Sequence, residues 1–226
     1  MKEVILKYIP NVLDNRIELM QSIGETIAMV SISGIISLVL GIIIGVFLVV
    51  TKEGNILENN IFNNIMGKII NFFRSIPFII LIGALIPLTR LIVGSAIGTK
   101  GAIVPLVFGT VPFFSRQIET ALMEVDKGVI EAAQAMGSSP LDIIFRVYLR
   151  EGLPGIIRGI TITLISLIGL SAMAGAIGGG GLGDFAIRYG YQRFQIDITY
   201  VTIIIILIFV SIIQGLGNLV LKKIER

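Results

Sequence analysis

Residues 26–51 read TIAMVSISGIISLVLGIIIGVFLVVT, an apolar run without a charged side chain between Glu25 and Lys52. About 20 such residues in a helix are enough to cross a hydrocarbon core roughly 30 Å thick. Two further runs, 159–183 and 198–221, are equally long and equally free of charge. These three runs predict three membrane-spanning helices and an all-α integral membrane protein.

The composition of the whole chain supports a membrane protein. Of 226 residues, 54% are hydrophobic and only 15% are charged, against about a quarter in soluble domains. The chain has no Cys and no His, which excludes disulfides and Cys/His zinc sites. We expect no cofactor, and the absence of a Lys/Arg run argues against nucleic-acid binding.

Two more spans are predicted between the first and second of these runs, at 69–89 and 91–115. Arg74 would lie near one interface, and Lys100 near a helix end or in a water-lined cleft. Four prolines interrupt the two segments, at Pro77, Pro87, Pro105 and Pro112. Irregular backbone at membrane depth needs protein or water to satisfy its polar groups, so we expect both spans to line the protein interior.

Five spans place the two ends of the chain on opposite faces of the membrane. With the C-terminus inside, the cytoplasmic segments hold eleven Lys and Arg residues and the external ones seven. The excess of positive charge favours a cytoplasmic C-terminus and an external N-terminus. We therefore expect a surface segment at 1–25, amphipathic and too charged for a signal peptide, a permease domain at 26–221 and a cytoplasmic tail at 222–226.

Two pairs of glycines have the spacing that lets membrane helices approach closely. Gly41 and Gly45 form one GxxxG pair, and Gly94 and Gly98 form the other. Such pairs also arise by chance in an apolar chain that is rich in glycine.

The longest polar stretch, 116–158, is predicted to be a cytoplasmic loop with two short helices. Asp126 can cap a helix that runs to Met136, and Gly137 suits the left-handed position that ends it. Ser139 can cap the next helix, with Pro140 at its first position and Asp142 placed to return a hydrogen bond. The first helix fits either a groove on a partner protein or the membrane surface.

Within this loop, Glu131-Ala132-Ala133 followed by Gly137 resembles the EAA loop of ATP-binding-cassette importer permeases. The resemblance implies a "coupling helix" that sits in a cleft of the ATPase subunit. It implies coupling residues at Glu131, Ala132, Ala133, Met136 and Gly137. The loop departs from the family further on, where Val147-Tyr148-Leu149-Arg150 replaces Ile-x-Leu-Pro, and Leu153-Pro154 is positioned to supply the helix break.

Several other segments, in order along the chain, are similar to permeases of methionine importers. They are 74–81 (RSIPFIIL), 86–90 (IPLTR), 102–106 (AIVPL), 171–175 (SAMAG), the glycine run 178–183 and Tyr189-Gly190-Tyr191. This resemblance implies a five-span homodimer in the bacterial cytoplasmic membrane, surrounded by lipid. It also implies two separate ATPase subunits and an extracytoplasmic methionine-binding protein. The chain would then be a transport subunit and not an enzyme, for methionine or for another small amino acid or related solute.

The resemblance places a gate at Met173, with Ser171 and Pro105 on the same pathway. Met173 lies midway along a charge-free span among small residues, where a flexible thioether can fill a closing gap. Ordinary helix packing is the alternative for this methionine.

Three other readings of the sequence are set aside. The glycine run fits GxGxxG but follows no predicted strand, which argues against a dinucleotide site. Gly181-Leu182-Gly183-Asp184 resembles an intramembrane aspartyl protease motif, but the Tyr-Asp pair of that class is absent. The three long spans contain no carboxylate for ion coupling, which argues against a secondary transporter, and no P-loop is present.

Overall fold

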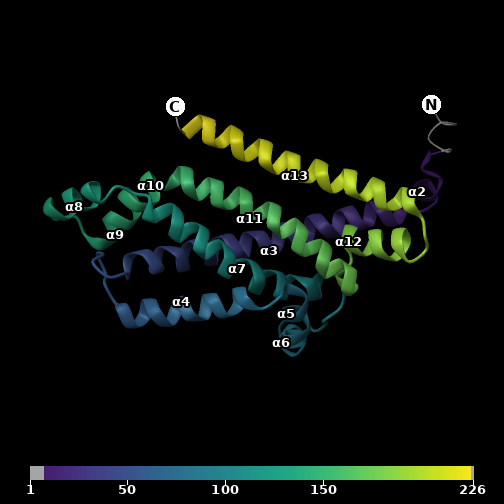
Figure 1. The fold of residues 1–226 in the computed structure, drawn as a ribbon, viewed down its shortest axis with the longest axis horizontal. Helices are drawn as coiled ribbons and strands as arrows, with labels where there is room; N and C mark the ends of the chain where they lie inside the picture. Colours follow the sequence, from purple (N-terminus) through teal and green to yellow (C-terminus); the bar gives the residue numbers. More distant parts are fainter. Residues whose placement is uncertain (1–7, 225–226) are drawn as a thin grey trace. The chain divides into compact units, whose positions relative to one another are not determined.

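The computed structural model describes residues 8–224, and over these residues the chain is built of helices without any strand (Figure 1). In chain order the α-helices are α2 (Pro10–Asp14), α3 (Arg16–Val50), α4 (Asn60–Ser75), α5 (Phe78–Ala84), α6 (Ile86–Val93), α7 (Gly98–Met123), α8 (Lys127–Ala135), α9 (Pro140–Asp142), α10 (Leu149–Glu151), α11 (Leu153–Ala174), α12 (Gly181–Phe185) and α13 (Ile196–Ile224). Three π-helical turns join them, η1 (Ile143–Tyr148), η2 (Gly175–Gly179) and η3 (Ala186–Tyr191). The predicted all-α membrane architecture is confirmed.

Four helices are long and apolar enough to cross a membrane, and a bent pair makes up to five. The predicted spans at 26–51, 159–183 and 198–221 correspond to α3, to α11 with η2, and to α13. The boundary expected at residue 26 falls inside α3, which begins at Arg16. Of the expected surface segment, residues 1–7 lie outside the described residues, as do residues 225–226 of the tail.

The span expected at 69–89, with its backbone interrupted by prolines, is a bent pair of helices that begins earlier, at Asn60. Helix α4 ends at Ser75, Ile76 adopts an extended conformation, and the chain turns by 104° into α5. The cause is Pro77, because a proline lacks an N–H and disfavours helical backbone in the residue before it. Only α4 followed by α5 remains as a broken fifth span.

The expected span at 91–115 is displaced toward the C-terminus. Gly94 ends α6 in the left-handed conformation, and α7 runs from Gly98 to Met123. Lys100 lies in the first turn of α7, as expected. Pro105 and Pro112 lie inside α7 without ending it.

The chain divides into two compact units, each described here by itself. Unit one comprises the described part of Met1–Ile35 together with Pro77–Phe108 and Leu164–Gln214. One apolar cluster in it joins α3, α5, α7 and α11 around Met29, Leu106 and Leu167. A second cluster joins α2, α3, α12, η3 and α13 around Phe185 and Ile198.

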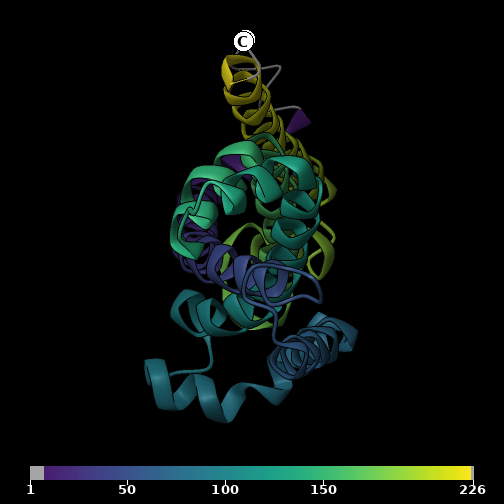
Figure 2. The same cartoon turned by 90° about the vertical axis from the view of Figure 1, so that its left-hand side faces the viewer.

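Unit two comprises Ile36–Ile76, Gly109–Thr163 and the described part of Gly215–Arg226. Its core joins the C-terminal halves of α3 and α7 with α8, η1 and the start of α11, around Phe114, Ile118 and Tyr148. The turn between α3 and α4 lies at the same end of this unit as α8 (Figures 1 and 2). Residues of both line a shared hollow.

The close approach predicted at Gly41 and Gly45 is confirmed within unit two. A Cβ atom added to Gly41 would collide with the Phe114 ring, and one on Gly45 would lie 2.5 Å from the Ile118 Cβ. Glycines at the start of α11 also allow close packing, here of α11 against α7, and this contact was not predicted from the sequence. A Cβ on Gly155 would lie 2.8 Å from the Ala121 Cβ.

The other predicted pair, Gly94 and Gly98, does not pack helices. Both glycines have positive φ, 79° and 78°, at the turn between α6 and α7, and no atom lies within 4 Å of a Cβ placed on either. Their spacing reflects a turn that needs left-handed backbone at both ends.

Candidate functional site

The cytoplasmic loop has the predicted pair of capped helices. The Asp126 carboxylate accepts a hydrogen bond from the Gly128 N–H at 2.6 Å, at the start of α8. Ser139 accepts one from the Asp142 N–H at 3.2 Å and donates its hydroxyl proton to the Asp142 carboxylate at 2.6 Å. This reciprocal pair fixes the start of α9, with Pro140 at its first position.

The turn between the two helices is a Schellman motif. The Ser138 N–H donates to the Ala133 carbonyl at 3.1 Å, and the Gly137 N–H donates to the Gln134 carbonyl at 2.9 Å. Gly137 has a φ of 76°, which explains the glycine at this position. The turn is therefore specified by local backbone chemistry and holds α8 at a defined angle to α9.

The five residues expected to meet the ATPase do not share one face. Ala133 is only 5% exposed and packs in the core of unit two. Glu131, Ala132, Met136 and Gly137 are exposed. The side chain of Ala133 thus anchors α8 to its own chain, and the exposed side of the helix is left to meet a partner.

That exposed side carries unusually large apolar side chains for a polar loop. Val129 and Ala132 of α8 and Met136, which caps its end, follow one another at helical spacing, and Met136 is 79% exposed. Leu141 and Phe145, four residues apart, are exposed as well. We call Val129, Ala132 and Met136 the α8 face.

A hollow of about 290 Å³ lies behind α8, beside the turn between α3 and α4. Tyr148 and Asn55 both line it, and the buried Tyr148 donates its hydroxyl proton to the Asn55 side-chain oxygen at 2.8 Å. Burial raises the pKa of the Tyr148 hydroxyl above its usual value of 10.0, while the bond to Asn55 lowers it. The neutral phenol therefore ties η1 to the α3–α4 turn.

The chain stays helical through the departure at Val147–Arg150. Arg150 lies in α10, and the single residue Gly152 separates α10 from α11. Pro154 falls in the first turn of α11, where a missing N–H costs least. The helix break expected at Leu153-Pro154 is thus the start of α11.

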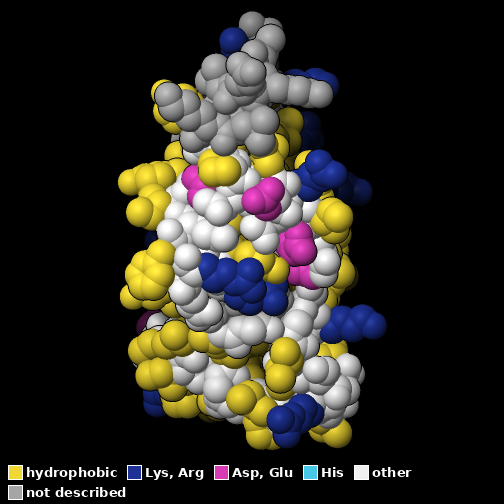
Figure 3. Space-filling view, turned by 90° about the vertical axis from the view of Figure 1, so that its right-hand side faces the viewer, with side chains coloured by type: hydrophobic (Ala, Val, Ile, Leu, Met, Phe, Trp, Pro, Cys, Tyr) yellow, Lys and Arg dark blue, Asp and Glu magenta, His cyan; other side chains and the backbone are white. Residues whose placement is uncertain are grey.

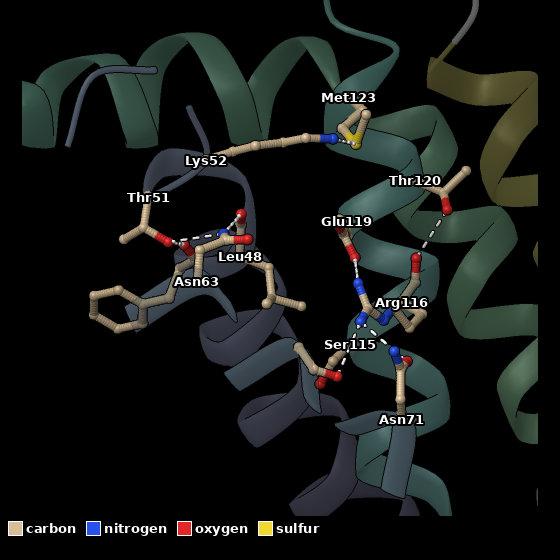
Figure 4. Close-up of polar contacts among 12 residues, drawn as sticks. Leu48, Thr51, Lys52, Asn63, Asn71, Ser115, Arg116, Glu119, Thr120 and Met123 are labelled. Carbon is tan, nitrogen blue, oxygen red and sulfur yellow. Dashed lines mark hydrogen bonds and ion pairs between the residues drawn. The ribbon is translucent and has the colours of Figure 1, made fainter. Parts of the chain in front are cut away.

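Arg116 joins α4 to α7 within unit two (Figure 4). Its guanidinium forms an ion pair with Glu119 at 2.5 Å and donates to the Asn71 side chain at 3.1 Å and the Gly67 carbonyl at 3.3 Å. The span predicted from the sequence ends at Ser115 and therefore leaves Glu119 outside it. Because Glu119 is paired, it is not a free carboxylate of the kind that couples ions.

The three gate residues also separate by exposure. Ser171 is 1% exposed and donates to the Ile168 carbonyl at 2.7 Å, and Pro105 is buried in α7. Met173 is 42% exposed on α11. Of the three, only Met173 presents its side chain at the surface of the chain.

The glycine run after Met173 folds into a tight turn between η2 and α12. Gly178, Gly180 and Gly181 all have positive φ. From α3, the Glu25 carboxylate accepts a hydrogen bond from the Gly181 N–H at 2.6 Å, and Thr26 accepts one from Leu182 at 2.8 Å. These two polar side chains were missed by sequence analysis, since nothing local links them to a segment 156 residues away.

Comparison with known proteins supports the resemblance. The model for the family described as "Binding-protein-dependent transport system inner membrane component" matches residues 37–226. The probable D-methionine transport system permease protein MetI of Vibrio cholerae is 48% identical over 208 residues, which cover 92% of each chain. The methionine import system permease protein MetP of Bacillus subtilis is 47% identical over 179 residues, 79% of this chain and 81% of that one.

A solved structure agrees with the fold. A chain from inward-facing conformations of the MetNI methionine ABC transporter superposes with a TM-score of 0.92 at 43% identity. The match covers 94% of this chain and 99% of that chain.

Proposed function

This chain belongs to the family of binding-protein-dependent transport system inner membrane components, and we propose that within it the chain is the permease subunit of a methionine importer. The observation that carries the proposal is the 48% identity to a methionine permease across 92% of both chains. The substrate follows from relatives that share nearly the whole fold, and not from a single motif. We place the protein in the bacterial cytoplasmic membrane, with 26–221 as its permease domain.

We further propose that two copies of this chain assemble with two ATPase subunits. The chain carries no P-loop, so nucleotide would be bound and hydrolysed by the separate subunits. The α8 face supports this assignment, because large apolar side chains on a capped, rigid helix suit a groove on another protein. Movement of each ATPase would carry α8 with it, and the helices would rock between inward and outward access to the substrate.

The external partner would be a methionine-binding protein that docks on the outer end of unit one. Figure 3 looks onto this end, where basic and acidic side chains lie together among apolar ones. Arg188 pairs with Asp184 at 2.9 Å, and the Arg188 and Arg193 guanidiniums lie 5.0 and 4.4 Å from the centre of the Tyr189 ring. Such polar groups need water or a polar partner and fit an aqueous face.

The experiment that tests this function is uptake of radiolabelled methionine into vesicles that contain the purified permease and its ATPase. Uptake should require both ATP and the binding protein, and unlabelled methionine should compete best among the amino acids. Uptake driven by a proton or sodium gradient without ATP would contradict the proposal. Equal or better competition by another amino acid would reassign the substrate and leave the transport function intact.

The membrane topology gives a separate prediction. Ten described Lys and Arg residues lie in unit two and five in unit one, which matches the predicted cytoplasmic and external segments. The chain has no native Cys, so single cysteines report cleanly. We expect Glu53→Cys, in the α3–α4 turn, to be shielded from a membrane-impermeant thiol reagent in intact cells.

The matched external variant is Tyr191→Cys, because Tyr191 is 73% exposed at the outer end of unit one. It should label rapidly in intact cells, and Glu53→Cys should label only after permeabilisation. The reverse pattern would invert the topology, and labelling of both sites in intact cells would rule out the five-span arrangement.

A further inference from the structure

Three hydroxyl groups inside unit two have no hydrogen-bond partner among the described residues. They are the side chains of Ser37 on α3, Thr110 on α7 and Thr163 on α11. Each residue is at most 1% exposed. A buried hydroxyl without a partner is costly, and most such groups in proteins are satisfied by protein or by ordered water.

These hydroxyls differ from other Ser and Thr side chains on the same helices. The usual solution in a helix is a bond to the carbonyl four residues earlier. Thr51, Ser115 and Thr161 follow it, with distances of 2.6, 2.8 and 2.9 Å. Ser37, Thr110 and Thr163 do not, so their hydroxyls are free to bond elsewhere.

The helix contacts in unit two bring the three residues to one level. Phe114 of α7 lies against both Gly41 of α3 and Gly159 of α11. Thr110 is one helical turn before Phe114, and Ser37 is one turn before Gly41. Thr163 is one turn after Gly159.

The directions of the helices put these turns on the same side of Phe114. Helices α3 and α7 run parallel, since Gly41 meets Phe114 and Gly45 meets Ile118. Helices α7 and α11 run antiparallel, since Gly155 meets Ala121 while Gly159 meets Gln117. Residues four apart share a helix face. Ser37 and Thr163 therefore lie at the level of Thr110, on the faces of α3 and α11 that meet α7.

The geometry points to a buried binding site for a single water molecule, which Ser37, Thr110 and Thr163 hold together. A buried water typically makes about three hydrogen bonds, and three hydroxyls on three helices supply that number. A cation is disfavoured here, because α3 after Glu25, α7 before Glu119 and α11 contain no carboxylate that could balance its charge. The water bridges α3, α7 and α11 inside unit two.

The sign of a stability change distinguishes a water site from three unsatisfied hydroxyls. If water is bound, Thr110→Val deprives it of one partner, and the melting temperature of the assembled transporter should fall by about 2–4 °C. If no water is bound, the same change removes an unsatisfied polar group and the melting temperature should rise. A rise would overturn the proposal.

A triple variant and a control complete the experiment. Ser37→Ala, Thr110→Val and Thr163→Val together remove every partner of the water, so the triple variant should melt closer to the wild type than Thr110→Val alone. Thr202→Val is the control, because the buried Thr202 bonds to the Ile198 carbonyl in the ordinary way. Should Thr110→Val not assemble, Ser37→Ala provides the same test of sign with a smaller change of volume.

Radiolytic footprinting gives a readout independent of stability. Phe114 is fully buried and should be protected from hydroxyl radicals generated in bulk solvent. Radicals formed from a water one turn away would label it in the wild type and not in the triple variant. Absence of label on Phe114 in the wild type would also overturn the proposal.

Discussion

Replacing Ala132 by aspartate is expected to abolish ATP-driven uptake while the permease remains folded and inserted in the membrane. Ala132 lies at the centre of the α8 face, three residues after Val129 and four before Met136, and it is exposed in this chain. In a docked complex the new carboxylate would be buried without a partner, at a cost of about 3 kcal/mol or more. That cost corresponds to a loss of roughly two orders of magnitude in association. Co-purification with the ATPase and uptake by vesicles measure the two effects.

Ala133→Asp is the informative comparison, because the next residue faces the other way. Ala133 packs in the core of unit two, so an aspartate there should disrupt the chain's own loop and lower expression or thermal stability. Ala132→Ser is the conservative control and should retain most activity. Normal uptake by Ala132→Asp, with the protein present at wild-type levels, would remove α8 from the coupling contact.

This pair of residues also indicates what the sequence could predict about the site. Asp126, Gly137 and Ser139 were assigned correctly, because caps and turns depend on residues within a few positions of one another. The orientation of Ala133 could not be predicted, since small alanines on both sides of α8 leave its inner face unmarked. That face is decided by packing into a core that includes Val49 and Val50 of α3, which lie far away in the sequence.

The fold shows the same contrast between features that short stretches of sequence determine and features that packing determines. Long charge-free runs predicted α3, α11 and α13, because the length of a span depends on the membrane alone. The 104° bend at Pro77 and the exact start of α7 depend on how short segments pack, and prolines alone did not distinguish them. Pro77 ends a helix, whereas Pro105 lies within one. Likewise, of the two GxxxG pairs, only Gly41 and Gly45 lie where helices pack together.

Met173 lies on a stripe of exposed residues along α11. The stripe has spacings of four and three residues, comprises Ile162, Ser166, Gly169 and Met173, and continues into η2 at Ala176. Three of its five members are small, whereas the exposed side of α13 is rich in Ile and Leu. Large aliphatic side chains suit lipid, and small ones suit close contact with another helix or with a pathway. This contrast favours a place for Met173 on the axis where two copies of the chain would meet.

Met173→Ala is therefore expected to assemble almost normally and to leak substrate or small solutes without ATP. Met173 is 42% exposed, so its truncation should cost this chain less than the 2–5 kcal/mol typical of a fully buried methionine. If the side chain only packs, the result should instead be lower stability without a specific leak. Solute efflux from vesicles without nucleotide separates the two outcomes. A cysteine introduced in place of Met173 should react with a water-borne thiol reagent at a rate that changes when nucleotide is trapped, and a cysteine that is inert in every nucleotide state would exclude the gate.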